Sequence, residues 1–426
     1  MNASLNGKSI AVQVDAHSLR IHSGLNGEAL SPILSHEDRI SIREFSPDGK
    51  LILTVGSGGK VRFWNVNSGN PVGADIEMSG QIQIVAFSPQ GDTVAFGCKD
   101  GTVHLWAVDT RERLHVIKWH EKRIRALRFH PTRRCLLTAS EDQTARLWDT
   151  ESGDPIGGSM RHEGSVFDAS FSPDGLRIVT AGMDGVARLW SAETTQSLAL
   201  PLRHNSNPVM RAFFSPNGKH ILALTASPVV YLWDAEIENT PARFLDSGWG
   251  TATASFSADG KWVASGHRWS SSKGLQIFDA NSLDRVALDR IQVGKVWSVS
   301  FSPDGRLLAT GDEGKVDGKA QIWDIKSGAK QCEVTHDNTV RSVVWSADSQ
   351  LIGTGSFDKT ARIWSASDGR PLGLPLQHPG IVEELAFGKT DQGRILVTAC
   401  ADGNARVWSV ETGELIFPEL NHGRSL

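Results

Sequence analysis

"ASEDQTARLWD" fills residues 139–149, and "AGMDGVARLWS" fills residues 181–191, 42 positions further along the chain. Both stretches contain a small residue, an acid, an apolar–Arg–apolar triplet and a tryptophan. The same tryptophan, replaced once by phenylalanine, recurs at Trp64, Trp106, Trp148, Trp190, Trp233, Phe278, Trp323, Trp364 and Trp408. Self-similarity at a period of about 40 residues indicates a repeat array.

Each repeat has the pattern of four short β-strands. Its first strand ends in an aromatic residue and is followed by a turn, SPDG at 46–49, 172–175 and 302–305, with the variants SPQG, SPNG and SADG elsewhere. Proline presets φ and glycine accepts a positive φ, so these turns predict tight reversals. Helical periodicity is absent, and short, evenly spaced strands are typical of a β-propeller. The sequence therefore predicts an all-β fold, a β-propeller of four-stranded antiparallel blades, because a single blade cannot bury both of its own faces.

The repeats predict one propeller over residues 1–426. A partial repeat occupies 1–34, where "SLRIHSGLNGEAL" matches "ARLWDTESGDPIG" in shape, and this repeat is expected to lack its first strand. Nine full repeats follow at about 35–77, 78–118, 119–160, 161–202, 203–245, 246–290, 291–334, 335–376 and 377–420. Because propellers usually have about four to eight blades, a seven-blade ring with extra blades is the alternative.

Composition argues against several classes of protein. The formal net charge is −4 with 22% charged and 39% hydrophobic residues, so neither a nucleic-acid binder nor a disordered chain is expected. There is no secretory signal and no apolar run long enough to span a bilayer, so no membrane association is expected. The cysteines, which show no Cys-x-x-Cys spacing, indicate no disulfide, no metal site, no cofactor and a cytoplasmic location; they are Cys98, Cys135, Cys332 and Cys400.

The repeats resemble those of the WD-repeat family, in which a strand ends in a Trp-Asp pair. Such pairs occur here as Trp148-Asp149, Trp233-Asp234 and Trp323-Asp324, and the resemblance covers nearly the whole chain. The second letter of the pair is relaxed elsewhere. In this respect the chain is similar to the divergent repeats of large bacterial regulatory proteins, which often accompany a kinase or another signalling domain.

The resemblance implies a hydrogen-bonded relay of His, Asp, Ser or Thr, and Trp inside each blade. A buried carboxylate needs donors, and a buried indole N–H needs an acceptor. The expected members are His120, Ser140, Asp142 and Trp148; His336, Ser356, Asp358 and Trp364; His162, Asp184 and Trp190; and His378, Asp402 and Trp408. Other repeats lack a member, with Gly58, Ser227 and Ser272 at the Asp position and Cys98 and Cys400 at the Ser or Thr position.

These His, Asp and Ser sets look like the triads of hydrolases. A catalytic set would be unique, however, whereas this one recurs once per repeat at a constant register. We therefore interpret the relay as internal bracing of each blade and expect no catalytic residue.

If the scaffold is repeated, function is expected where the repeats differ. In this family, side chains near the start of the first strand lie at the top face and the central channel. Counting back four residues from the strand-ending aromatic gives Ser41, Gln83, Arg125, Phe167, Met210, Ala252, Trp297, Arg341 and Glu383. The apolar residues of this strand break strict alternation, and a β-bulge at its start would reconcile them.

Four adjacent repeats present apolar residues at this position, and arginines flank them. The expected partner-binding residues are Phe167, Met210, Trp297, Arg125 and Arg341, with Trp249 and Trp269 from a loop (246–251) and an enlarged turn (266–274). A second enlarged turn covers 311–319. Aromatic residues, Met and Arg are typical of interface hot spots. The alternative is that these side chains fill the channel.

Together these patterns predict a non-catalytic scaffold that binds other proteins or peptides on the top face. A regulatory or sensory subunit for a separate signalling enzyme is the first alternative. The second is an enzyme with a site at the channel mouth. It would need a unique cluster of acids or histidines there, and Glu383 is the only acid among the nine positions.

Overall fold

The structure is a computed structural model. It describes residues 2–4, 9–23, 29–78, 81–199, 201–203, 207–225, 230–235, 243–245, 251–267, 274–280, 282, 295–314, 316–390, 393–416 and 420–421. All regular elements in these ranges are β-strands. None of the described segments is a helix of the length and apolarity needed to cross a lipid bilayer.

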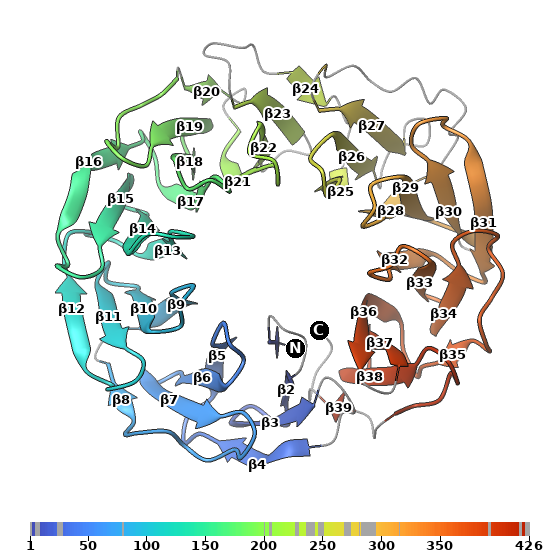
Figure 1. The fold of residues 1–426 in the computed structure, drawn as a ribbon, viewed down its shortest axis with the longest axis horizontal. Helices are drawn as coiled ribbons and strands as arrows, with labels where there is room; N and C mark the ends of the chain where they lie inside the picture. The colour runs from blue at the N-terminus through green and yellow to red at the C-terminus, as the bar shows by residue number, and fades with distance from the viewer. Residues whose placement is uncertain are drawn as a thin grey trace.

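The strands form ten antiparallel sheets, each built from strands that follow one another in the chain. Figure 1 shows these sheets arranged around one ring. We call the sheets blades 1 to 10 in chain order. The predicted all-β propeller of four-stranded blades is confirmed.

The strands of the first five blades have the following bounds. Blade 1 contains β1 (Asn2–Ala3), β2 (Ser9–Gln13), β3 (Ser18–Ser23) and β4 (Ala29–Ser35). Blade 2 contains β5 (Ile40–Phe45), β6 (Leu51–Gly56), β7 (Lys60–Asn65) and β8 (Ile76–Glu77). Blade 3 contains β9 (Ile82–Phe87), β10 (Thr93–Cys98), β11 (Val103–Ala107) and β12 (Arg113–Ile117). Blade 4 contains β13 (Ile124–Phe129), β14 (Cys135–Ser140), β15 (Thr144–Asp149) and β16 (Pro155–Arg161). Blade 5 contains β17 (Val166–Phe171), β18 (Arg177–Gly182), β19 (Val186–Ser191) and β20 (Leu202–Arg203).

The second half of the ring repeats the same order. Blade 6 contains β21 (Val209–Phe214), β22 (His220–Thr225), β23 (Val230–Asp234) and β24 (Arg243–Leu245). Blade 7 has three strands among the described residues, β25 (Thr251–Phe256), β26 (Trp262–His267) and β27 (Leu275–Asp279). Blade 8 contains β28 (Val296–Phe301), β29 (Leu307–Asp312), β30 (Gly318–Asp324) and β31 (Lys330–His336). Blade 9 contains β32 (Val340–Trp345), β33 (Leu351–Ser356), β34 (Thr360–Ser365) and β35 (Leu376–Gln377). Blade 10 contains β36 (Val382–Thr390), β37 (Gly393–Cys400), β38 (Asn404–Ser409) and β39 (Leu420–Asn421).

Blade 1 does have a first strand. Asn2 and Ala3 of β1 pair with Ala11 and Ile10 of β2, and Ser4 N donates to Ser9 O at 2.9 Å. The expectation that this repeat lacks its first strand is therefore wrong. β1 lies antiparallel to β2 and completes a four-stranded sheet.

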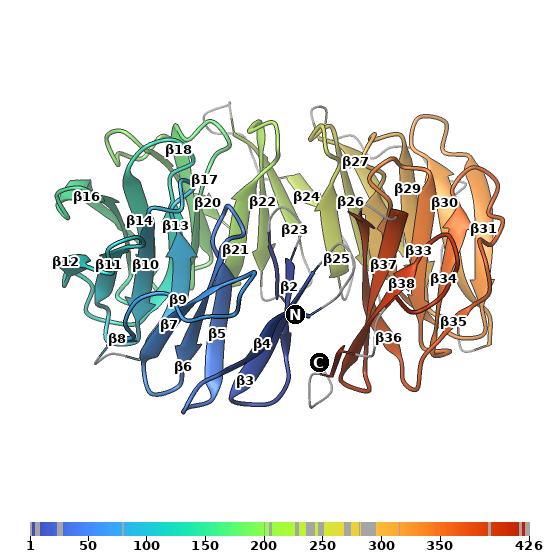
Figure 2. The same ribbon diagram turned by 60° about the horizontal axis from the view of Figure 1, so that its bottom comes forward.

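The connections between strands fall on two rims of the ring (Figure 2). Because neighbouring strands are antiparallel, the turns between second and third strands share one rim with the loops that lead from blade to blade. We call this rim the top face. The bottom face carries the turns between first and second strands and the connections between third and fourth strands. The first strands of blades 2 to 10 line the central opening (Figure 1).

The SPDG turns on the bottom face have the predicted geometry. In the turn at 46–49, Ser46 Oγ donates to Asp48 Oδ1 at 2.7 Å, and Leu51 N donates to Ser46 Oγ at 3.0 Å. Gly49 has a φ of 71°, a value that favours glycine because it has no Cβ. The turn therefore closes the first hairpin of blade 2 with local hydrogen bonds.

The apolar core lies between the blades. The ten clusters of buried residues each combine side chains from two blades that are neighbours in the ring. The fully buried Trp148 of blade 4, for example, shares its cluster with Val103 and Leu105 of blade 3. Burying an indole removes roughly 150–250 Å² of surface from water. Stacking around the ring thus covers both faces of every blade.

Side-chain packing closes the ring between blades 10 and 1. The cluster at this junction contains Ile10 and Val12 of β2 with Ile395, Ala405 and Val407 of blade 10. Among the described strands, no sheet combines strands from both ends of the chain. In the described part of the chain, apolar side chains therefore make this junction, and the two blades share no β-sheet.

The substitution Ile395→Ala should weaken this closing junction. Ile395 is 4% exposed, and truncation of a buried isoleucine to alanine typically costs about 2–5 kcal/mol because a cavity remains. We expect a lower melting temperature in differential scanning fluorimetry and faster proteolysis close to both ends of the chain. As a matched control, Ile178→Ala at the junction of blades 4 and 5 should lower the melting temperature without exposing the chain ends. Unchanged cleavage near the ends in Ile395→Ala would contradict closure by packing.

Candidate functional site

The top face is braced by a buried relay, which is most complete in blade 4. His120 Nδ1 lies 2.7 Å from Asp142 Oδ2, in the turn between β14 and β15. His120 Nε2 lies 2.7 Å from Thr138 Oγ1, and Trp148 Nε1 donates to the same hydroxyl at 2.9 Å. One tautomer satisfies the whole chain of contacts: the indole donates to the hydroxyl, the hydroxyl donates to Nε2, and Nδ1–H donates to the carboxylate. Each buried polar group in the relay thus has a partner, as buried polar groups require.

The hydroxyl group of this relay belongs to Thr138, and the assignment of Ser140 is therefore wrong. Ser140 Oγ donates to Lys122 O at 2.8 Å and accepts from Asp142 N at 3.1 Å. Thr138 and Ser140 lie two residues apart on one strand, so they share a face of the sheet. Both hydroxyls therefore fit the sequence pattern of the relay, and only the position of the indole shows which of them belongs to it.

Blades 5 and 9 contain the same relay. In blade 5, His162 Nδ1 lies 3.0 Å from both oxygens of Asp184, and Thr180 Oγ1 contacts His162 Nε2 at 2.7 Å and Trp190 Nε1 at 2.9 Å. In blade 9, the corresponding residues are His336, Asp358, Thr354 and Trp364. Ser356 again stands outside the relay, since its hydroxyl donates to Asn338 O at 3.0 Å.

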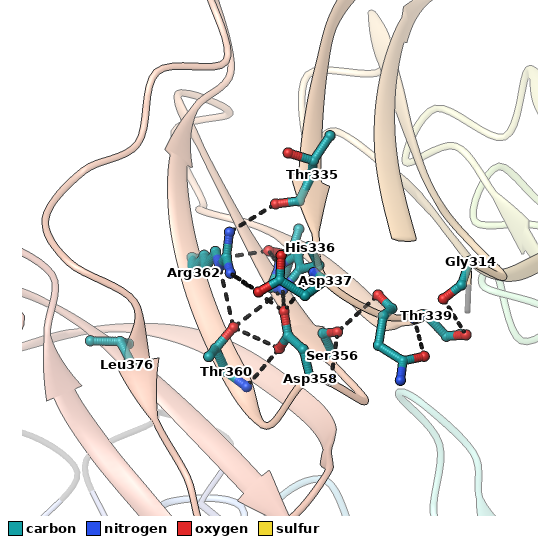
Figure 3. Close-up of polar contacts among 12 residues, drawn as sticks. Gly314, Thr335, His336, Asp337, Thr339, Ser356, Asp358, Thr360, Arg362 and Leu376 are labelled. Carbon is teal, nitrogen blue, oxygen red and sulfur yellow. Dashed lines mark hydrogen bonds and ion pairs between the residues drawn. The ribbon is translucent and has the colours of Figure 1, made fainter. Parts of the chain in front are cut away.

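The surroundings of Asp358 show how the relay ties three segments together (Figure 3). Thr360 Oγ1 donates to Asp358 Oδ1 at 2.7 Å, and Asp337 N donates to Oδ2 at 3.1 Å. Arg362 Nη2 lies 3.5 Å from the same carboxylate, and Arg362 Nη1 donates to Thr335 O at 3.0 Å. The turn, the third strand and the loop from the preceding blade are thereby fixed to one another.

Blade 10 departs from the expected relay. His378 Nε2 lies 2.7 Å from Thr398 Oγ1, which also accepts from Trp408 Nε1 at 3.0 Å. His378 Nδ1, however, faces Leu376 O at 2.8 Å, and Asp402 pairs with the buried Arg406 at 2.6 Å. The expected contact between His378 and Asp402 is therefore wrong, because the guanidinium group takes the carboxylate.

Blade 2 contains a partial relay that the sequence pattern missed. His36 Nε2 lies 2.6 Å from Thr54 Oγ1, and Trp64 Nε1 donates to this hydroxyl at 2.7 Å. At the Asp position stands Gly58, where an added Cβ would collide with the carboxylate of Asp38. Burial and the nearby charge of Arg62 lower the pKa of His36 to about 4, so the ring is neutral at physiological pH. The 18-residue spacing between His and Thr, which is shared with blade 4, could have revealed this relay.

The relay aspartates remain ionised although they are buried. Burial alone would raise the pKa of Asp142 and Asp184. Hydrogen bonds from the neighbouring histidine and from backbone N–H groups outweigh burial and bring each pKa to about 2. The pKa of Asp358 is lowered by the same balance. These carboxylates are therefore bound to their own blades and are not available as general bases.

The nine residues counted back from the strand-ending aromatics all lie at β-bulges. In β13, for instance, Ile124 pairs with Ser140 and Ala126 pairs with Ala139, so Arg125 between them has no partner across the sheet. The same shift occurs at Ser41, Gln83, Phe167, Met210, Ala252, Trp297, Arg341 and Glu383. A bulge leaves its extra residue outside the ladder and re-aims its side chain. The predicted bulge is therefore confirmed.

The two bulged arginines cover aromatic residues of neighbouring blades. The guanidinium carbon of Arg125 in blade 4 lies 5.4 Å from the ring centroid of Phe167 in blade 5. Arg341 of blade 9 lies 5.4 Å from the ring centroid of Trp297 in blade 8. Both distances permit a cation–π interaction. Met210 of blade 6, between these pairs in the ring, is 44% exposed. We call Phe167, Met210 and Trp297 the apolar sector.

Two residues of the top turns were missed by sequence reasoning. Phe357, in the top turn of blade 9, meets the Trp297 ring edge-on at a centroid distance of 5.4 Å. Met183, in the top turn of blade 5, is 56% exposed. Phe357 and Met183 directly precede a relay aspartate. A comparison of that turn position between repeats would have found them.

Charged side chains converge just below the apolar sector on the channel wall. Asp168 follows Phe167 directly, and its side chain is only 11% exposed. Arg128 of blade 4 and Arg211 of blade 6 approach its carboxylate from either side, at 3.9 and 4.0 Å. Burial raises the pKa of Asp168, although both arginines act in the opposite direction. One buried carboxylate therefore lies between two cations from different blades.

The enlarged turn of blade 8 lies beside Trp297 on the top face. Asp312, the last residue of β29, accepts a hydrogen bond from Lys319 N at 2.6 Å, and Lys295 Nζ pairs with Glu313 at 3.2 Å. Burial raises the pKa of Asp312 to about 6. Trp249 and Trp269, the other two predicted partner-binding residues, lie outside the described residues.

The described residues offer little for catalysis or metal binding. Cys98 and Cys135 are buried free thiols, and burial raises the pKa of each to about 11. A thiol that remains protonated is a poor nucleophile. In the parts of the chain that the structure describes, no group of three or more His, Cys, Asp or Glu side chains is placed to hold a metal ion.

Comparison with known proteins agrees with this architecture. The family profile described as WD domain, G-beta repeat matches residues 27–65, 77–107, 111–149, 155–191, 290–324 and 330–365, about half of the chain. The chain belongs to the WD40-repeat family. As a WD40 propeller, it is similar in fold to a crystal structure of a eukaryotic initiation factor, with a TM-score of 0.61, 17% identity, and coverage of 87% of this chain and 96% of that chain.

Curated relatives match only part of this WD40 protein. A probable cytosolic iron-sulfur protein assembly protein 1 from Candida glabrata is 32% identical over 136 residues, which are 28% of this chain and 39% of that protein. Apoptotic protease-activating factor 1 from Rattus norvegicus is 31% identical over 162 residues, which are 38% of this chain and 12% of that protein. The matched region spans well under half of each relative. Both relatives are eukaryotic, so the resemblance to bacterial regulatory proteins stays a prediction.

The substitution Thr138→Val should destabilise blade 4. It removes the hydroxyl that serves both Trp148 and His120 and leaves an indole N–H buried without an acceptor, at a cost of about 1–3 kcal/mol. We expect a lower denaturation midpoint in urea for this variant. Thr138→Ser, which keeps the hydroxyl, is the matched control and should lose less. Equal losses in the two variants would mean that the methyl group, and not the hydroxyl, stabilises the blade.

Acidification should destabilise the relay blades. The pKa of Asp142 is about 2 in the folded chain against 3.8 for the free group. This carboxylate therefore contributes stability that is fully present above pH 3.8 and is lost as the pH falls towards 2. We expect the melting temperature, followed by circular dichroism, to drop over this interval, and to drop less steeply in Asp142→Asn. An identical pH dependence in both proteins would contradict the assigned hydrogen bonds.

Proposed function

We propose that this WD40 propeller is a non-catalytic protein-interaction scaffold whose partner binds the top face at the apolar sector. The proposal rests on a difference between two kinds of position in the blades, those of the relay and turns and those of the bulges. Relay and turn residues recur from blade to blade, whereas the bulged residues vary along the ring, with only arginine occurring twice. Strand pairing does not fix the identity of a bulged residue, so these positions can vary with a partner.

The composition of the sector supports this proposal. Phe167, Met210 and Trp297 supply apolar area, and Arg125 and Arg341 stand at its two ends. Aromatic residues and arginine are enriched among the residues that dominate binding energy. Exposed Met183 and Met210 extend the apolar surface over blades 5 and 6. If these side chains served only to fill the channel, there would be no reason for the methionine at this position to be exposed.

A regulatory or sensory subunit for a separate signalling enzyme is the second candidate. Such a subunit would use the same face. This candidate is motivated by the resemblance to divergent repeats of bacterial regulatory proteins. Catalysis at the channel mouth is the weakest candidate, because both ring nitrogens of the relay histidines in blades 4, 5 and 9 face protein groups. The free cysteines are consistent with a reducing, cytoplasmic location, which we retain as part of the proposal.

The double substitution Phe167→Ala/Trp297→Ala should abolish partner binding and preserve the fold. Loss of a hot-spot aromatic typically costs about 2 kcal/mol or more of binding energy. Affinity capture of the full chain followed by mass spectrometry, repeated with the double variant, measures the effect. Leu176→Ala is the control, since Leu176 is a 56% exposed apolar residue of a bottom-face turn. If every captured partner binds the double variant normally, the sector is not the site.

A further inference from the structure

Arginines gather on one side of the central channel. Within the first strands of blades 4 to 9, basic residues outnumber acids, with Arg125, Arg128, Arg211 and Arg341 against Asp168. The start of the first strand of blade 10 carries the opposite charge, with Glu383 and Glu384. The chain as a whole has a formal net charge of −4. The apolar sector therefore lies in a locally basic part of an acidic protein.

The two arginines beside Asp168 keep most of their capacity to bind an anion. Their side chains are 45% exposed for Arg128 and 66% exposed for Arg211. Their contacts with Asp168, at 3.9 and 4.0 Å, are longer than hydrogen bonds. Arg128 Nη1 donates to Leu127 O at 2.8 Å, and among the described residues Arg211 donates no hydrogen bond. A ligand carboxylate at this point would meet two guanidinium groups. Asp168 balances the positive charge of only one of them.

The sector and these cations are adjacent in the structure. Phe167 precedes Asp168 and Met210 precedes Arg211, so each apolar residue of blades 5 and 6 stands next to the charged group. The ends of the sector carry Arg125 and Arg341, which lie over the rings of Phe167 and Trp297. An apolar surface bordered by cations on several sides favours a ligand with an apolar centre and anionic flanks.

We propose that the partner of the top face is an acidic peptide segment. Its apolar or aromatic residue packs on Phe167 and Met210, and its flanking Asp or Glu side chains pair with Arg128 and Arg211. This inference rests on the proposed function and adds the chemistry of the partner to it.

Single-stranded nucleic acid also combines stacking with negative charge, but it fits this surface less well. Binding of a polyanion uses a continuous basic groove that follows the backbone. Here the basic side chains end at blade 10, whose Glu383 and Glu384 would repel phosphates. Arg125 is also paired with Glu141 at 2.8 Å. The observations therefore favour a short acidic peptide.

Selection from a random peptide library displayed on phage tests this proposal. The bait is the full chain, and the variants are the double substitution Arg128→Gln/Arg211→Gln and the control Arg134→Gln. Arg134 lies on the bottom face, and its side chain is 66% exposed, as is that of Arg211. We expect the wild-type chain and Arg134→Gln to enrich acidic peptides with an aromatic or aliphatic residue. A selected peptide should bind the double variant at least about tenfold more weakly in fluorescence anisotropy, equivalent to about 1.4 kcal/mol.

Three outcomes would overturn the proposal. They are enrichment of peptides without an acidic bias, equal affinity of the wild-type chain and the double variant for a selected peptide, and no enrichment above the empty matrix. Tighter binding of oligothymidylate than of the selected peptide would identify the sector as a nucleic-acid site instead. If Phe167→Ala/Trp297→Ala loses its partners while Arg128→Gln/Arg211→Gln keeps them, the top-face site stands and its acidic specificity fails.

Discussion

The whole structure depends on the stacking of sheets face to face. A short antiparallel sheet with apolar residues on both faces gains stability only when a neighbour covers each face. This need explains why the buried clusters lie between blades and not within them, and why Trp148 belongs to the core of blade 3 as much as to its own blade. It also explains the closing junction. Ile10 and Val12 of the first blade must bury their surface, and the last blade offers Ile395 and Val407.

Stacking fixes the blades, and the relay then fixes their upper rim. In blade 4, one hydroxyl on Thr138 connects the indole of the third strand to the histidine of the preceding loop, and the histidine connects to Asp142 in the top turn. Because every member is buried and hydrogen-bonded, loss of one leaves another unsatisfied. The rim is therefore a rigid support. On it the bulged residues, which make no ladder contacts, can differ from blade to blade without cost to the fold.

Charge on the channel wall arises only when blades are brought together. Asp168 would be an expensive buried carboxylate on its own. Arg128 and Arg211 approach it from the two neighbouring blades, and together they leave a net positive charge next to the apolar sector. Apolar area and positive charge thus come from the first strands of blades 4, 5 and 6, which the ring places side by side.

The sequence by itself determined the propeller, the SPDG turns and the bulges, because repetition at a fixed period makes local patterns visible. The resemblance to the WD-repeat family implied the relay of blades 4, 5 and 9 but placed its hydroxyl at Ser140 and Ser356, since residues two apart share one face of a strand. It also paired His378 with Asp402, whereas Asp402 pairs with the buried Arg406. The tertiary structure alone decided these points. It also decided the antiparallel pairing of β1 with β2, the contact of Phe357 with Trp297, and the meeting of Asp168 with two arginines. Each of these depends on which side chains meet through space, and spacing along the chain does not carry that information.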